Sequence, residues 1–176
     1  TQVTKTGSEE VKLHFEKGEL KKINDKKFDH PSLAIQYLQT LAGPYGIGRD
    51  IHVGDTIIGI KGRVGFEAAA PMVILKAHHA LEKHVLTKWQ LQWKDQLAQF
   101  YGNWLHEGQI LDPVMRDIET YLESSQRNVT GDVFVQLLPY RFQIIGIESK
   151  YDLMNSKFGK YGEMNTGFTG DDVRGF

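Results

Sequence analysis

The sequence lacks cysteine, charge of one dominant sign and long hydrophobic runs, and each absence excludes a class of protein. With no Cys among 176 residues, disulfides, thiolate metal sites and a cysteine nucleophile are all excluded. The formal net charge is −1, and neither a basic block nor a basic stripe occurs. This balance argues against nucleic acid or an anionic membrane surface as the main partner.

The hydrophobic residues are sufficient for a core but are not arranged for a membrane. No apolar run approaches the roughly 20 residues that a membrane span needs. The first residues, TQVTKTGSEE, contain nothing like the apolar stretch of a signal peptide. The chain is 40% hydrophobic and 11% aromatic, which is enough to fold one domain. We therefore expect a single cytoplasmic domain without a membrane partner.

Hairpins separated by a block of helices are predicted along the chain. Val11, Leu13 and Phe15 alternate with polar residues before a turn at Gly18, which predicts a first hairpin. Residues 129–149 predict a second hairpin, turning at Pro139-Tyr140. Between the hairpins we expect a helix over 31–41, capped by Asp29, and then a strand around 52–61. Two helices over 71–104, divided by a cap at Thr87, and a helix from Asp112-Pro113 to about Ser125 follow. After residue 155 we expect an extended tail. This order predicts an α+β domain with an antiparallel or mixed sheet.

A histidine-rich segment, KAHHALEKH, is the candidate metal site. Ligands on one helix face need spacings of three or four residues. His78 and His79 both meet this spacing with Glu82, whereas His84 lies about 140° around the helix from His79. Because a third ligand is missing, we expect these histidines at solvent or an interface, and no bound zinc.

The remaining chemical signals are weak. The loop GPYGIGRD matches no phosphate-binding pattern, and no serine lies in G-x-S-x-G. Trp89, Trp93 and Trp104 have helix-like spacing, which favours a core or subunit-interface position over stacking on a ligand.

The segment IIGIKGRVGFEAAAP, residues 57–71, has an unusual composition for a core strand. Lys61 and Arg63 alternate, so on a strand they share one side, and Gly62 lets the backbone approach a ligand closely. Glu67 precedes a predicted helix whose N-terminus favours anions. These features predict a small-anion or amino-acid pocket. The alternative is a plain strand-to-helix connection with solvated charges, in which Glu67 pairs with Arg63.

Five motifs resemble one family, in order, across nearly the whole chain. GIGRDIHVGDTIIGIKGRVGFEAAAP resembles the argininosuccinate synthase pattern G-x-G-R … (I/V)-G-x-K-S-R-G-x-Y-E-x-P. KAHHALEKHVLTK is similar to the helix that follows it, and FYGNWLHEGQILDPVMRDIE to Y-x-G-x-W-x-S-P-E and its helix. SQRNVTGDVFVQLL with IESKYDLMN, and finally TGDDVRGF, resemble the later family segments.

The resemblance implies the carboxy-terminal synthetase and multimerisation domain of such an enzyme. The family enzyme joins citrulline and aspartate, using ATP with magnesium and releasing AMP and pyrophosphate. Its S-G-G-x-D loop for ATP and its long terminal helix have no counterpart in this sequence, which begins at Thr1 and ends at Phe176. We therefore expect a fragment that is inactive alone, partners its own amino-terminal domain and belongs to a tetramer. The alternative is a non-enzymatic assembly or sensor module derived from the synthase.

The resemblance also implies that this part forms one wall of the citrulline pocket and supplies no catalytic group, cofactor ligand or metal ligand. The substrate-binding residues carried over by motif position are Phe66, Gly54, Arg63, Lys61 and Glu67.

Three of the motif positions depart from the family pattern. The family has a tyrosine where Phe66 stands, a glutamate at Gly54 and a serine at Gly62. Asp55 replaces that glutamate only if the strand slips by one residue, which would turn its side chain to the other face. Because a buried ammonium needs a partner, one hypothesis is that this variant accepts an N-acylated citrulline; ordinary citrulline held by repositioned groups is the alternative.

Overall fold

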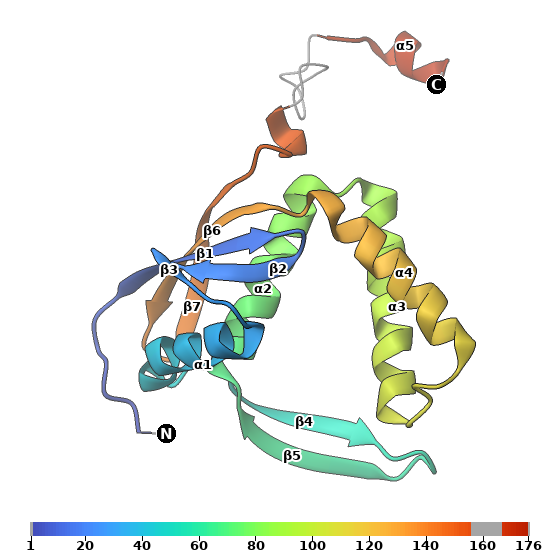
Figure 1. Cartoon of the computed structure of the whole chain (residues 1–176). Helices are drawn as coiled ribbons and strands as arrows, with labels where there is room; N and C mark the ends of the chain where they lie inside the picture. Colours follow the sequence, from blue (N-terminus) through green and yellow to red (C-terminus); the bar gives the residue numbers. More distant parts are fainter. Residues whose placement is uncertain (1, 156–166, 176) are drawn as a thin grey trace.

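A computed structural model describes residues 2–155 and 167–175, and its main body is a five-stranded antiparallel sheet (Figure 1). The strand order is β3-β2-β1-β6-β7. The strands are β1 (Glu9–Glu16), β2 (Glu19–Ile23), β3 (Lys26–Lys27), β6 (Gly131–Leu138) and β7 (Arg141–Glu148). Both predicted hairpins are therefore confirmed, and the pairing of β1 with β6 joins them into one sheet. The α+β prediction is confirmed as well.

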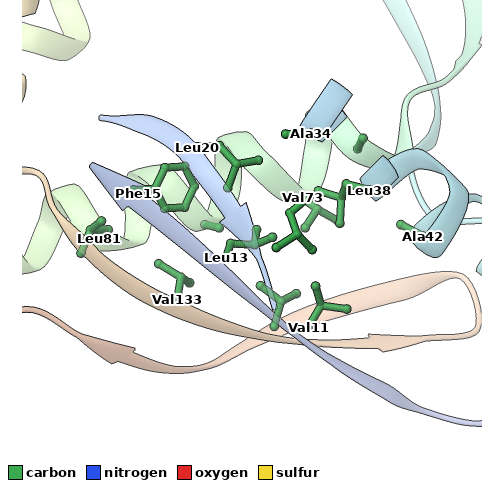
Figure 2. Packing of buried hydrophobic residues seen from close by; sticks show 14 of the residues in the cluster. Val11, Leu13, Phe15, Leu20, Ala34, Leu38, Ala42, Val73, Leu81 and Val133 are labelled. Atoms are coloured by element: carbon green, nitrogen blue, oxygen red, sulfur yellow. The ribbon is translucent and has the colours of Figure 1, made fainter. Parts of the chain in front are cut away.

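The core lies between this sheet and two helices, α1 (Pro31–Ala42) and α2 (Ala69–Val85). Val11 pairs across the sheet with Val135 and Leu13 with Val133, so their side chains share one face. Figure 2 shows Val11, Leu13 and Val133 in one cluster with Leu38 and Val73 from the helices. The alternating apolar residues of β1 therefore form the sheet side of a single core.

The helix boundaries follow the predicted caps with one correction. Thr87 caps α3 (Lys88–His106) through a capping box with Gln90, and Asp112 caps α4 (Pro113–Ser125), as expected. At α1 the cap is His30 rather than Asp29, because the His30 Nδ1 accepts a hydrogen bond from the Ser32 N–H at 3.2 Å. Pro31 then occupies the first helical position, where no N–H is needed.

The helices α3 and α4 lie side by side beyond one end of the sheet (Figure 1). No residue described in α3 is fully buried. Trp89 is 61% exposed and Trp93 is 56% exposed, so the core position proposed for the tryptophans is wrong for these two. Their role at a subunit interface stays a prediction.

A second, two-stranded sheet projects from the body as a ribbon, made of β4 (Arg49–Asp55) and β5 (Lys61–Glu67). The prediction of one strand over 52–61 is wrong. The chain turns at residues 56–60, where the Gly59 N–H donates to the Thr56 carbonyl at 2.8 Å and Gly59 has a φ of 80°. Figure 1 shows the ribbon running from the start of α2 toward the far end of α3.

Short elements complete the fold: η1 (Gly43–Tyr45), η2 (Gln126–Asn128), η3 (Leu153–Asn155) and α5 (Gly170–Arg174). The prediction of an extended tail after residue 155 is therefore wrong at α5, which is helical. For residues 156–166 the same prediction lies outside the described residues. No helix within the described ranges is long and apolar enough to cross a membrane.

Candidate functional site

The ribbon is tied to the body at its base. Gly48 has a φ of 77°, and a side chain there would meet the Ala68 carbonyl at 2.6 Å, so only glycine allows this close approach. The Ala68 N–H donates to the Gly48 carbonyl at 2.9 Å. One step outward, the Arg49 Nε lies 2.9 Å from the Glu67 Oε1. Glu67 therefore pairs with Arg49 across the ribbon, and the pairing of Glu67 with Arg63 considered from the sequence is not what forms.

The register divides the ribbon into two faces, because directly opposed residues of an antiparallel pair point to the same side. Face A is defined by the pairs Arg49–Glu67, Ile51–Gly65, Val53–Arg63 and Asp55–Lys61. Face B is defined by the pairs Asp50–Phe66, His52–Val64 and Gly54–Gly62. Lys61, Arg63 and Glu67 thus belong to face A, whereas Phe66 and Gly54 belong to face B.

The five residues predicted to bind substrate are therefore not gathered at one point. Phe66 and Glu67 line the same shallow hollow at the base of the ribbon, of about 630 Å³, together with Arg49 and Asp50. Gly54 lines a different cavity near the tip. Phe66 and Gly54 are also the only residues described within β4 and β5 that are half-buried rather than exposed. Face B is consequently the more sheltered of the two.

The second cavity, which we call the tip cavity, lies between the end of the ribbon and the end of α3. Its volume is about 610 Å³, and its lining includes His52, Gly54, Gly62, Val64, Asn103, His106 and Glu107. The opposed Gly54 and Gly62 carry no side chains; the His52 ring covers Gly54, while the space beside Gly62 is open. The cavity therefore combines exposed backbone at Gly62 with imidazole, amide and carboxylate groups.

Asp55, the proposed substitute for the missing glutamate, does not reach face B. It stands opposite Lys61 on face A, and its Oδ1 lies 2.5 Å from the Lys61 Nζ. The strand has not slipped, so the side chain at position 55 points away from Gly54, as the alternation of a strand requires.

The start of α2 is already occupied by a side chain. The helix begins at Ala69 rather than at Pro71, and the Ala70 N–H donates to the Gln39 Oε1 at 3.0 Å. One of the free N–H groups expected to attract an anion is thereby satisfied from α1.

The histidine-rich segment forms a buried polar network instead of a metal site. Glu82 is fully buried; its Oε2 accepts a bond from the Lys94 Nζ at 2.8 Å and its Oε1 from the Gln126 Nε2 at 2.8 Å. His78 bonds to the Gln126 Oε1 at 3.0 Å, and burial is the main cause that lowers the pKa of His78. His78 is therefore half-buried within this network, which corrects its expected place at solvent, while a place at an interface stays a prediction.

The remaining histidines of the segment also lie beside carboxylates. The His79 Nδ1 lies 3.6 Å from the Glu82 Oε2, and the His84 Nδ1 lies 3.2 Å from the Asp152 Oδ1. Within residues 2–155 and 167–175, no group of three or more metal-ligating side chains is close enough to hold an ion.

Sequence reasoning missed Asp50, His52 and His106 as candidates. Asp50 and His52 alternate with Gly54, so a correctly placed strand from 49 to 55 would have put all three on one face. His106 reaches the tip cavity from the end of α3, although it is far from His52 in the sequence. That proximity is set by tertiary structure and has no local signal.

Comparisons with known proteins place the chain in a family of ligase domains. The family model described as "Arginosuccinate synthase C-terminal domain" matches residues 1–176. The argininosuccinate synthase of Dictyoglomus turgidum is 36% identical over 166 residues, covering 94% of this chain and 41% of that protein. That of Staphylococcus carnosus is 39% identical over 153 residues, covering 87% and 38%. The corresponding enzyme of Methanocaldococcus jannaschii is 32% identical over 153 residues, again covering 87% and 38%.

These matches establish what kind of domain the chain is. It belongs to the argininosuccinate synthase C-terminal domain family, which confirms the resemblance found in the motifs. The chain spans 38–41% of the length of these relatives.

Proposed function

We propose that this chain is the carboxy-terminal part of an ATP-dependent carbon–nitrogen ligase that forms argininosuccinate in arginine biosynthesis. The observation that carries the proposal is the match of the family model to residues 1–176, supported by relatives named argininosuccinate synthase. In the complete enzyme, ATP with magnesium activates the ureido oxygen of citrulline as an adenylate and releases pyrophosphate. The aspartate amine then displaces AMP.

The share of this chain is to position the acceptor, not to activate it. A ureido carbon is a poor electrophile, so the enzyme's contribution is to hold three ligands in register and to offset phosphate charge. We assign one wall of the citrulline pocket to face B, because Phe66 and Gly54 stand where the family pattern has its tyrosine and glutamate and are the half-buried residues of the ribbon. Lys61, Arg63 and Glu67 lie on face A, where they act by bracing the ribbon or by contacting the amino-terminal domain.

Activity of the isolated and the complete protein tests this proposal. With citrulline, aspartate and ATP as probes, residues 1–176 alone should release no AMP. The full-length protein should release AMP and pyrophosphate in equal amounts, and it should assemble as a homotetramer in the cytoplasm. A coding sequence that extends upstream into an S-G-G-x-D loop supports the ligase. A start codon directly before Thr1 supports the non-enzymatic assembly or sensor module instead.

A second candidate acceptor is an N-acylated citrulline, and the pair Gly54–Gly62 favours it. Neither residue of this pair carries a side chain; a Cβ built on Gly62 would meet nothing within 4 Å, whereas one built on Gly54 would meet only the His52 ring. Restoring the family's side chains with Gly54→Glu and Phe66→Tyr should shift the preference of the full-length enzyme from N-acetylcitrulline toward citrulline. Preference of the unmodified enzyme for free citrulline would remove this candidate.

A further inference from the structure

The tip cavity contains a histidine that is not used elsewhere in the fold. His52 lies on face B between the pairs that carry Phe66 and Gly54. Its ring extends over Gly54, so that a Cβ built on Gly54 would lie 2.7 Å from the His52 Nε2. The imidazole therefore fills the space that a side chain at position 54 would otherwise take.

Among the charged groups of the ribbon, Arg63 belongs to face A, and those that could compete with His52 for a ligand already have partners. The Asp50 Oδ1 accepts the Ile51 N–H at 2.7 Å, Asp55 pairs with Lys61, and Glu67 pairs with Arg49. His52, by contrast, makes no hydrogen bond or ion pair to any residue in the described part of the chain. Asp55 and Thr56 line the cavity as well, but Asp55 pairs with Lys61 and the Thr56 Oγ1 accepts the Ile60 N–H at 3.0 Å. His52 is consequently the polar side chain of this wall whose hydrogen-bonding atoms are not used by the fold.

We propose that His52 is a specificity-determining residue that hydrogen-bonds an amide substituent on the substrate nitrogen, with the tip cavity receiving that substituent. This inference rests on the proposed function, since it takes face B as the wall of the acceptor pocket. Imidazole donates from one ring nitrogen and accepts at the other when neutral, which suits an amide C=O or N–H. An ammonium group instead requires a carboxylate. Asp55 and Glu67 are held in ion pairs, and Asp50 lines the hollow at the base of the ribbon rather than the tip cavity.

The opposite wall of the cavity supplies complementary groups. Asn103 and His106 from α3 are hydrogen-bonding side chains that line the same space, and Val64 adds an apolar surface on the ribbon side. Glu107 is the carboxylate of this wall. The presence of Glu107 is the basis of a competing hypothesis, in which the cavity binds the free ammonium of citrulline.

The test uses the full-length enzyme with N-acetylcitrulline and citrulline as alternative acceptors. His52→Ala should lower kcat/KM for N-acetylcitrulline about tenfold, the loss expected for one hydrogen bond, and should change kcat/KM for citrulline far less. His52→Gln, which keeps a donor and an acceptor, should recover most of the loss. His30→Asn is the matched control, because it changes an exposed histidine outside the ribbon and retains the cap of α1. Thermal unfolding of each variant separates a folding defect from a change in preference.

Two results would overturn the inference while leaving the proposed function standing. One is an unchanged ratio of the two kcat/KM values in His52→Ala. The other is a preference of the unmodified enzyme for free citrulline; loss of that preference in Glu107→Gln would show in addition that the cavity binds an ammonium. If the unmodified enzyme releases AMP with neither acceptor, the proposed function itself fails and the role of His52 fails with it.

Discussion

The sheet of the body and the β4–β5 ribbon are built from similar residues but bury them very differently. Val11 and Leu13 in β1 are 1% and 0% exposed, whereas Ile51 and Val53 in β4 are 60% and 59% exposed. Both strands carry β-branched or aliphatic residues at alternate positions, which favours extended structure in either place. What differs is the presence of covering helices. The residue composition therefore favours a strand in both places, whereas the burial of that strand depends on which elements pack against it.

A two-stranded ribbon is at best marginally stable in isolation. This one is held by backbone pairing at its base and by the Arg49–Glu67 and Asp55–Lys61 ion pairs. Its side chains therefore remain available to ligands or to the rest of the protein. The body, in contrast, uses its apolar residues for its own stability.

Truncation of the body core should give the largest effect. Leu13 is completely buried and packs in the cluster shown in Figure 2. Leu13→Ala should lower the free energy of unfolding by roughly 2–5 kcal/mol, because it removes buried methyl groups and leaves a cavity. Val53→Ala in the ribbon is the matched control and should cost less than about 1 kcal/mol. Urea unfolding followed by circular dichroism measures both, and equal losses would contradict the division into body and ribbon.

The Glu82 network should give the next largest effect, since it joins α2 to α3 through a buried charge. Lys94→Met leaves the Glu82 carboxylate without its cation and should cost roughly 3 kcal/mol. Replacing both partners, with Glu82→Leu and Lys94→Met together, should recover most of that loss because no unpaired charge remains. A double variant less stable than Lys94→Met would show that the carboxylate has a structural role beyond the pair.

The same network predicts how stability depends on pH. Burial is the main cause that lowers the pKa of His78, while the facing Glu82 raises it and Lys94 and His79 lower it further. With a folded pKa below the usual 6.5, the unfolded chain binds a proton first, so stability falls as the pH drops through 6.5 toward the folded pKa.

The measurement compares unfolding midpoints at pH 7.5 and pH 5.5 for the unmodified chain and for His78→Gln. Gln keeps a hydrogen-bonding group toward Gln126 but cannot take up a proton, so this variant should lose less stability on acidification. His30→Asn serves as the control for general histidine titration. An identical pH dependence in the unmodified chain and His78→Gln would rule out this role of His78.

The contrast between body and ribbon also explains what could be predicted from the sequence. Local sequence patterns predict the first hairpin and the caps at Thr87 and Asp112, and all of these predictions are confirmed. The ribbon was misplaced because Ile57, Ile58 and Ile60 look like the continuation of a strand. They lie instead in an exposed turn. An apolar turn gives no local sign of a chain reversal, apart from Gly59.

The candidate site was predictable only in part for a related reason. Motif positions identified Phe66 and Gly54, but they could not tell which face of the ribbon each residue occupies. That assignment needs the register of Gly54 opposite Gly62, which is fixed by the length of the turn. The contribution of Asn103, His106 and Glu107 depends on where α3 ends relative to the ribbon. It is a tertiary feature that no spacing in the sequence encodes.

The smallest effect is expected from the ion pair beside the turn of the ribbon. Lys61 and Asp55 are 67% and 57% exposed, so their attraction is weakened by water and salt. Lys61→Ala should lower the free energy of unfolding by no more than about 0.5 kcal/mol, and the difference should vanish at high salt. Asp55→Asn should behave in the same way, and the double variant should match either single one. A loss that persists at high salt would mean that Lys61 stabilises the ribbon through packing of its aliphatic stem, and the ribbon would then resemble the body more closely than its exposure indicates.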